Sequence, residues 1–224
     1  MNLIGNINAI PFRRFRGGGG VSPIPPFPSI SGITARYSAL GLTNEQMAAN
    51  PVWVDKTGNG HDLQMKNFAW KGGSGISDVY LGALVFDGVD DYGVCDNFPI
   101  LTKEKGYTVV ALRQWDQDFL NTTLTGGLLS TRNYSTGEGV AFEKIESSRK
   151  GYWNLGAGGI IDFAKSPFTW QTSKQYNNVG ILKGGKNHGK PLCVGCGLSG
   201  GQQCGRFAIW ELVILDHDAT EEEL

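Results

Sequence analysis

The sequence predicts an all-β protein that forms a two-sheet antiparallel β-sandwich and carries an extended amino-terminal arm. Three observations support this prediction. Short apolar runs alternate with turn residues, the 224 residues include 33 glycines, and no long amphipathic helical pattern is present. A single sandwich of this length buries a substantial hydrophobic core.

Residues 1–31 are expected to form an arm outside the globular domain. They hold the run "GGGG" and the segment "VSPIPPFPSI", and no acidic residue occurs before Glu45. Glycine makes such a chain flexible, and proline favours an extended path with few backbone donors. The arm is either a disordered tail or an anchoring peptide that binds a partner protein. The residues expected to anchor it are Phe12, Arg13, Arg14, Phe15 and Arg16.

Residues 32–224 are expected to form the sandwich. A first strand is predicted at 32–40, followed by a short helical turn within 42–50. The stretch 52–70 indicates strand, turn and strand, because its "TGNG" supplies residues that tolerate positive φ.

Two later strands are long enough to compare. The run "YTVVALRQW" alternates as a half-buried strand does, whereas "FAIWELVIL" has enough consecutive apolar residues for burial on both faces. Near the end of the sequence, Thr220 and Glu223 have the spacing of a helix capping box.

The stretch "ALVFDGVDDYGVC", residues 83–95, concentrates three aspartates in an apolar context. We expect a hairpin with a three-residue loop, Asp87–Val89, that pairs Leu84 with Tyr92 on one apolar face. The aspartates then satisfy turn amides. A calcium ion needs about six oxygen ligands, of which this loop offers two or three. Calcium therefore stays an alternative, and we expect no cofactor and no resident metal.

The residue patterns of hydrolytic enzymes are weak in this chain. Glu143 and Glu146 are spaced so that they point to opposite faces of a strand, which argues against a retaining glycosidase. His61 is expected to flank a turn. The pair Cys193 and Cys196 forms a C-x-x-C motif without a second paired knuckle, so buried reduced thiols are favoured over zinc. We therefore expect no enzyme.

The net charge and the hydropathy of the chain argue against a nucleic-acid-binding protein and against a membrane-spanning protein. The formal net charge is -1, which gives no field suited to nucleic acid or an anionic membrane. No apolar run approaches the ~20 residues of a membrane helix. The arginines near the amino terminus follow the apolar stretch instead of preceding it, unlike a secretory signal.

Taken together, the motifs "WVDKTGNGHDLQMKNFAW", "LVFDGVDDYG", "YTVVALRQW", "GGLLSTRN" and "GRFAIWELVILDHDATEEEL" resemble a laminin G-like, concanavalin A-like jelly roll. The resemblance covers residues 32–224 and implies that fold. The chain is similar in particular to domains in proteins of gut-bacterial phages and mobile elements. Such folds serve lectins, adhesion modules, hydrolases and virion parts, so the site must decide the function.

The resemblance, the arm and the missing export signal suggest a non-enzymatic virion-associated protein. It would be a capsid decoration or head fibre component, assembled in the host cytoplasm, that displays a lectin-like domain. We expect a homo-oligomer that binds other virion proteins through its arm. The alternatives are a hydrolase or lyase acting on polysaccharide, and a bacterial surface adhesion module.

Glycan binding would require aromatic rings beside polar side chains at a loop rim. The alternative for Tyr152 and Trp153 is that they fill the sandwich core, where we also expect the other tryptophans. The candidate ligand-binding residues are Arg132, Asn133, Tyr134, Tyr152, Trp153 and Asn154.

Overall fold

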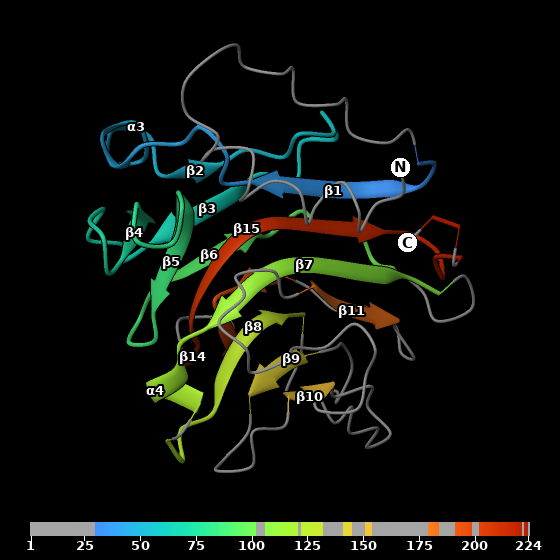
Figure 1. Ribbon diagram of the computed structural model, residues 1–224. Helices are drawn as coiled ribbons and strands as arrows, with labels where there is room; N and C mark the ends of the chain where they lie inside the picture. Colours follow the sequence, from blue (N-terminus) through green and yellow to red (C-terminus); the bar gives the residue numbers. More distant parts are fainter. Residues whose placement is uncertain are drawn as a thin grey trace, which may run out of the picture.

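The computed structural model shows two β-sheets packed face to face, which confirms the predicted sandwich (Figure 1). The residues that the structure describes are 30–101, 106–120, 122–131, 141–144, 151–153, 179–183, 191–198, 202–220 and 222–223. The arm predicted at residues 1–31 lies almost wholly outside them, so its boundary stays a prediction. In the described ranges, no helix is both long and apolar enough to cross a membrane.

The first sheet has six strands, all paired antiparallel. In spatial order the strands are β11 (Val179–Lys183), β7 (Thr108–Trp115), β15 (Arg206–Leu215), β5 (Ala83–Asp87) and β4 (Gly75–Ser77), with β1 (Ile33–Ser38) beside the second half of β15. The central strand is β15. It pairs with β7 along its length on one side, and with β5 and then β1 on the other side.

The second sheet has nine strands. Seven of them lie side by side in the order β10 (Gly151–Trp153), β9 (Ala141–Lys144), β8 (Gly126–Ser130), β12 (Leu192–Val194), β6 (Tyr92–Cys95), β3 (Leu63–Lys66) and β2 (Val52–Trp53). The hairpin of β13 (Cys196–Leu198) and β14 (Gln202–Cys204) joins β8 through one parallel pairing, Cys204 with Gly127.

Among the described residues, two short helices accompany the sheets, α3 (Asn44–Ala49) and α4 (Gln117–Leu120). The first confirms the predicted helical turn. Thr43 caps it, because its hydroxyl accepts from the Gln46 N–H while its own N–H donates to the Gln46 side chain. Met47 is the buried residue that fixes this helix to the core.

Strand β15 is buried on both faces, as its sequence predicts. Phe207, Ile209 and Leu212 belong to the core between the sheets, whereas Trp210 and Val213 belong to a second apolar cluster on the opposite face. A register irregularity between Ile209 and Glu211 accounts for the change in alternation at this point. The half-buried pattern expected for β7 is wrong, because nearly all of its residues are buried.

Aromatic rings fill the space between the sheets. The rings of Phe86 and Phe207 stack at 4.7 Å between centroids, and Trp115 meets Phe207 edge-on at 5.1 Å. Trp53 also lies in this core, as predicted, and Trp70 packs against it while half-buried. Trp170 lies outside the described residues.

The hairpin predicted for residues 83–95 is wrong. Strand β5 pairs with β15 and β4 in the six-stranded sheet, whereas β6 pairs with β3 and β12 in the nine-stranded sheet. Residues 88–91 therefore cross from one sheet to the other, and Leu84 and Tyr92 are not paired. Strands in facing sheets both bury alternate residues in the shared core, so the apolar pattern cannot distinguish a crossover from a hairpin.

Candidate functional site: an acidic rim

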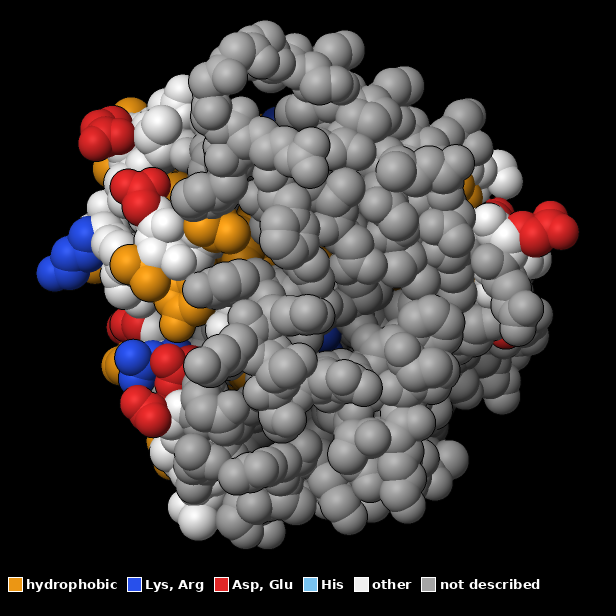
Figure 2. Space-filling view, in the orientation of Figure 1, with side chains coloured by type: hydrophobic (Ala, Val, Ile, Leu, Met, Phe, Trp, Pro, Cys, Tyr) orange, Lys and Arg blue, Asp and Glu red, His pale blue; other side chains and the backbone are white. Residues whose placement is uncertain are grey.

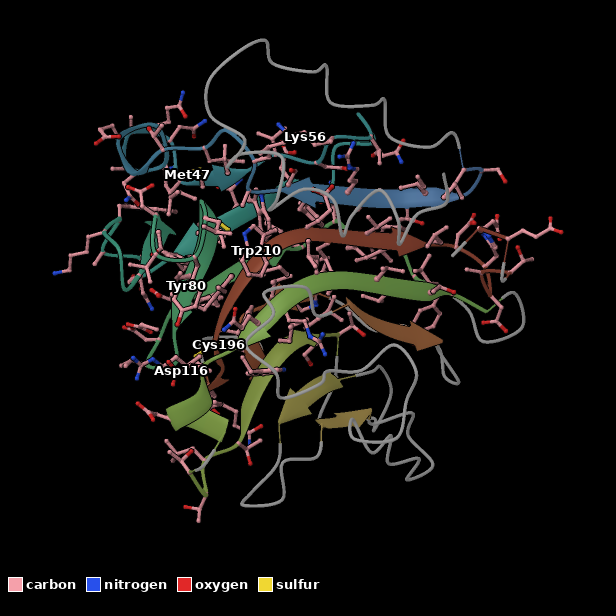
Figure 3. All side chains as sticks on the ribbon, viewed as in Figure 1. Met47, Lys56, Tyr80, Asp116, Cys196 and Trp210 are labelled. Atoms are coloured by element: carbon pink, nitrogen blue, oxygen red, sulfur yellow. A yellow bond between two sulfur atoms is a disulfide. The ribbon has the colours of Figure 1, made fainter. Side chains whose placement is uncertain are left out.

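Loops from both sheets meet at one end of the sandwich. Arg206 pairs in register with Asp87, at the end of β5, and its carbonyl accepts the N–H of Asp116 at 3.0 Å. The Arg206 Nε lies 3.5 Å from a carboxylate oxygen of Asp116. We call Asp87, Asp90, Asp91, Asp116 and Arg206 the acidic rim. Asp116 is labelled in Figure 3, and acidic and basic side chains lie close together on the same edge in Figure 2.

Two of the rim aspartates build the crossover turn. The Asp87 Oδ1 accepts the N–H of Val89 at 2.7 Å and that of Asp90 at 3.4 Å. The Asp90 carbonyl accepts the side-chain amide of Asn67 at 3.0 Å. Gly88 has a φ of +78°, and a Cβ there would come within 2.7 Å of Arg206. The expectation that aspartates satisfy turn amides is thus confirmed.

Asp91 is the buried member of the rim. Its Oδ1 accepts the hydroxyl of Ser74 at 3.0 Å, and its Oδ2 accepts the N–H of Asp87 at 3.0 Å. The Ser74 hydroxyl oxygen in turn accepts the N–H of Ala69 at 2.8 Å. Burial raises the pKa of the Asp91 carboxyl to about 7, because two hydrogen bonds do not replace the lost hydration. Asp91 therefore ties the 69–74 turn to the crossover.

The three aspartates of the crossover bring carboxylate oxygens within 4.8 Å of one another. Both oxygens of Asp91 and one oxygen of Asp87 already accept bonds from the protein. A calcium site would need about six oxygens and would compete with these donors. The geometry is that of a hydrogen-bonded turn, and calcium binding stays an untested alternative.

The motif "DKTGNGHD" forms a second hydrogen-bonded loop, centred on the buried Asp55. The Asp55 carboxylate accepts the hydroxyl of Thr57 at 2.7 Å and the backbone N–H groups of Arg36 and Thr57, each at 3.0 Å. His61 Nδ1 lies 3.0 Å from the carbonyl of Thr34. These bonds fasten the loop to β1. His61 is therefore a turn residue, as predicted.

A further histidine lies near the end of the sequence. His217 contacts Asp216 at 3.2 Å and Glu223 at 3.2 Å. Burial lowers the pKa of this imidazole, but the bonds to Asp216 and Glu223 outweigh that effect and the net shift is upward. The predicted capping box is present, because Glu223 accepts the Thr220 N–H and the Thr220 hydroxyl oxygen accepts the Glu223 N–H.

The cysteines correct one expectation. Cys196 and Cys204 form a disulfide with Cα atoms 4.1 Å apart, whereas Cys95 and Cys193 are buried and do not take part in it. The C-x-x-C pair is thus divided between two environments and does not act as one knuckle. Cys196 and Cys204 pair in register in the β13–β14 hairpin. The short glycine-rich stretch between them was the available signal in the sequence.

The predicted glycan-binding residues fall largely outside the described residues. This holds for Arg132, Asn133, Tyr134 and Asn154, and likewise for the anchoring residues of the arm. For Tyr152 and Trp153 the structure describes the backbone, which lies in β10 and pairs with that of Glu143 and Phe142 in β9. Sequence reasoning also missed Ser74 and Arg206, whose roles come from contacts distant in sequence.

Comparisons with known proteins place the chain in a structural class. No protein-family model matches it, and no curated protein matches it in sequence. A sialidase from Trypanosoma rangeli in complex with 2,3-difluorosialic acid is similar, with a TM-score of 0.54 and 15% identity over 87% of this chain. The botulinum neurotoxin serotype D binding domain is similar at 0.52 and 10% identity over 86% of it. That toxin's ligand binding domain in complex with N-acetylneuraminic acid also has a TM-score of 0.52.

The chain corresponds to only part of each of these proteins. It spans 32% of the sialidase chain and 50% of the serotype D binding-domain chain. At these identities the likeness shows the fold alone, which is a β-sandwich.

Proposed function

We propose that the chain is a non-enzymatic binding module that recognises glycans through a lectin-like sandwich. The observation that carries the proposal is the fold, shared over 87% and 86% of this chain with a sialidase and a toxin domain that were each solved with sialic-acid-type ligands. A fold alone does not fix a function, so the support is for a class of ligand.

Two of the described acidic groups, Asp91 and Asp55, are poorly placed for hydrolysis. A glycosidase needs two carboxyl groups that reach opposite sides of a bound sugar. The Asp91 carboxylate is buried and accepts bonds at both oxygens, and Asp55 is buried under bonds from Thr57 and Arg36. Neither carboxylate is placed to touch a sugar.

The proposed ligand site consists of Tyr134, Tyr152 and Trp153 with the polar side chains of Arg132, Asn133 and Asn154. Aromatic rings of this kind stack on the apolar face of a sugar, while amide and guanidinium groups bond to its hydroxyls. The proposal needs no cofactor.

The proposed setting is a virion. The arm, with Phe12, Arg13 and Arg16 among its anchoring residues, would bind another particle protein through apolar contacts and arginine–carboxylate pairs. The sandwich would then be displayed outward as a homo-oligomeric decoration or fibre component, assembled in the host cytoplasm. Mass spectrometry of purified particles should detect the chain in a fixed ratio to the capsid protein. Its absence from them would remove this part of the proposal.

A glycan array tests the binding function. The full chain should bind a subset of glycans, and Trp153→Ala should lose that binding at an unchanged melting temperature. Val89→Ala, a change at an exposed rim residue, serves as the control and should bind as the native protein does. Release of reducing sugar from the bound glycans would instead identify a hydrolase.

A further inference from the structure

The free edge of strand β4 is closed by one side chain. Among the described strands, β4 pairs only with β5, so its other edge is a margin of the six-stranded sheet. The Asn44 side chain lies along that margin. Its Nδ2 donates to the Ile76 carbonyl at 2.9 Å, and its Oδ1 accepts the Ile76 N–H at 2.8 Å. One asparagine thus makes both hydrogen bonds that a residue of a neighbouring strand would make.

These two bonds satisfy the backbone groups of β4 that point away from the sheet. In an antiparallel pair, alternate residues direct their N–H and C=O groups toward the partner strand. Since Ile76 directs both of its groups to Asn44, its neighbours Gly75 and Ser77 face β5. The strand contains only these three residues. The edge that another strand could use is therefore one residue long, and Asn44 occupies it.

The backbone next to Ile76 has room for the asparagine because position 75 is a glycine. Gly75 has a φ of +141°, a conformation that other residues rarely adopt. A Cβ at this position would collide with Asn44 Oδ1 and would lie 2.9 Å from the Lys71 backbone nitrogen. A larger residue at position 75 would thus displace the asparagine amide from the edge.

Helix α3 holds Asn44 in place. Asn44 is the first residue of this helix, directly after the Thr43 cap. Met47, one turn further on, is 2% exposed and packs in the core between the sheets. Figure 1 shows α3 and β4 at the same margin of the molecule. The asparagine amide is therefore positioned by a capped and anchored helix and not by a loop.

We propose that Asn44 protects the β4 edge against self-association. The unpaired N–H and C=O groups of an edge strand are a template for pairing with another chain. Two copies of β4 could pair antiparallel about a two-fold axis centred on Ile76, because such an interface is self-complementary. Asn44 occupies the place of that second copy, so any oligomer of this chain forms through other surfaces. The inference does not depend on glycan binding.

Removal of the asparagine amide from the full chain tests the proposal. At high protein concentration, Asn44→Ala should sediment as a species of about twice the native mass, because the edge is open to a second copy. Asn50→Ala is the matched control, since Asn50 is an exposed asparagine at the other end of α3. Asn44→Asp should also keep the native mass, because a carboxylate still accepts the Ile76 N–H and its charge opposes edge pairing. An Asn44→Ala protein of native mass at every concentration would overturn the proposal.

Hydrogen exchange locates the new contact. At low concentration, the Ile76 amide of Asn44→Ala should exchange about tenfold faster than in the native protein, and it should regain protection as the concentration rises. Association without this change at Ile76 would place the contact elsewhere and contradict the proposal.

The native protein supplies a test that needs no variant, which decides if Asn44→Ala does not fold. The Ile76 amide should be protected about as well as the Met47 amide, whose N–H donates to the Thr43 carbonyl within α3. Both amides should become exposed together, because the β4 edge opens only when the helix moves away. Fast exchange at Ile76 beside slow exchange at Met47 would show that Asn44 does not cover the edge.

Discussion

The outer faces of the two sheets differ in a way that bears on function. On the six-stranded sheet, Val110 and Val213 are buried on the face that points away from the core. On the nine-stranded sheet, Gln64 and Lys66 of β3 are exposed and Val94 of β6 is half-buried at the corresponding positions. The described side chains of one face are therefore buried, and β3 on the other meets solvent. A ligand or partner has direct access to β3 of the nine-stranded sheet.

The largest predicted effect separates the two faces. Val213→Asp should lower the free energy of unfolding by about 4 kcal/mol, because it places a carboxylate in a buried apolar cluster. Val94→Asp makes the same change on the half-buried face and should cost about 1 kcal/mol, mostly from lower strand propensity. Urea unfolding of both variants measures the difference. Equal losses would show that the two faces are covered alike.

The next largest loss of stability is expected on removal of the disulfide in the β13–β14 hairpin. Cys196 and Cys204 are separated by 8 residues and closed by a disulfide. Replacing both with serine should lower the free energy of unfolding by about 2.5 kcal/mol, from the loop entropy regained by the unfolded chain. Cys193→Ala leaves the disulfide in place and is the control. A double-serine variant as stable as the oxidised native protein would contradict this prediction.

The crossover between the sheets should make stability depend on pH. The pKa of Asp91 is raised in the folded state to about 7 from 3.8, so the folded protein holds a proton that the unfolded chain releases. The contribution of this group is therefore fully present below about pH 4 and is lost as the pH rises to 7. The two pKa values set an upper bound of about 4 kcal/mol, and relaxation of the turn around the charged carboxylate reduces the expected loss to about 2 kcal/mol.

Denaturant unfolding from pH 4 to 7 checks this sign. Asp91→Asn should flatten the profile, because an amide does not titrate. Asp90→Asn removes only the smallest of the effects that raise the pKa of Asp91 and should leave most of the slope in place. A native profile that rises over this interval would show that other groups dominate.

The smallest effect is expected on the exposed face. Gln64→Ala and Lys66→Ala should each change the free energy of unfolding by less than about 0.5 kcal/mol, because surface substitutions remove few contacts. Thermal unfolding measures both. A loss several times larger would mean that a further part of the chain covers β3.

The sequence predicted the two-sheet architecture, the capped turn at Thr43 and the double burial of β15, because each depends on a local pattern. It did not predict that residues 88–91 cross between the sheets, because alternate burial is the same for partners in one sheet and for strands in facing sheets. The contact of Asp91 with Ser74 joins residues 17 apart and leaves no local pattern. The glycan site remains a prediction, since the side chains that would form it lie outside the described residues.

The position of β15 in the chain order has a consequence for how the molecule assembles. It pairs with β1, β5 and β7, yet it comes after all of them in sequence. During synthesis these three strands must wait with unpaired edges until residues 206–215 emerge. We expect folding of the six-stranded sheet to be late and slow, and incomplete chains to be prone to aggregation.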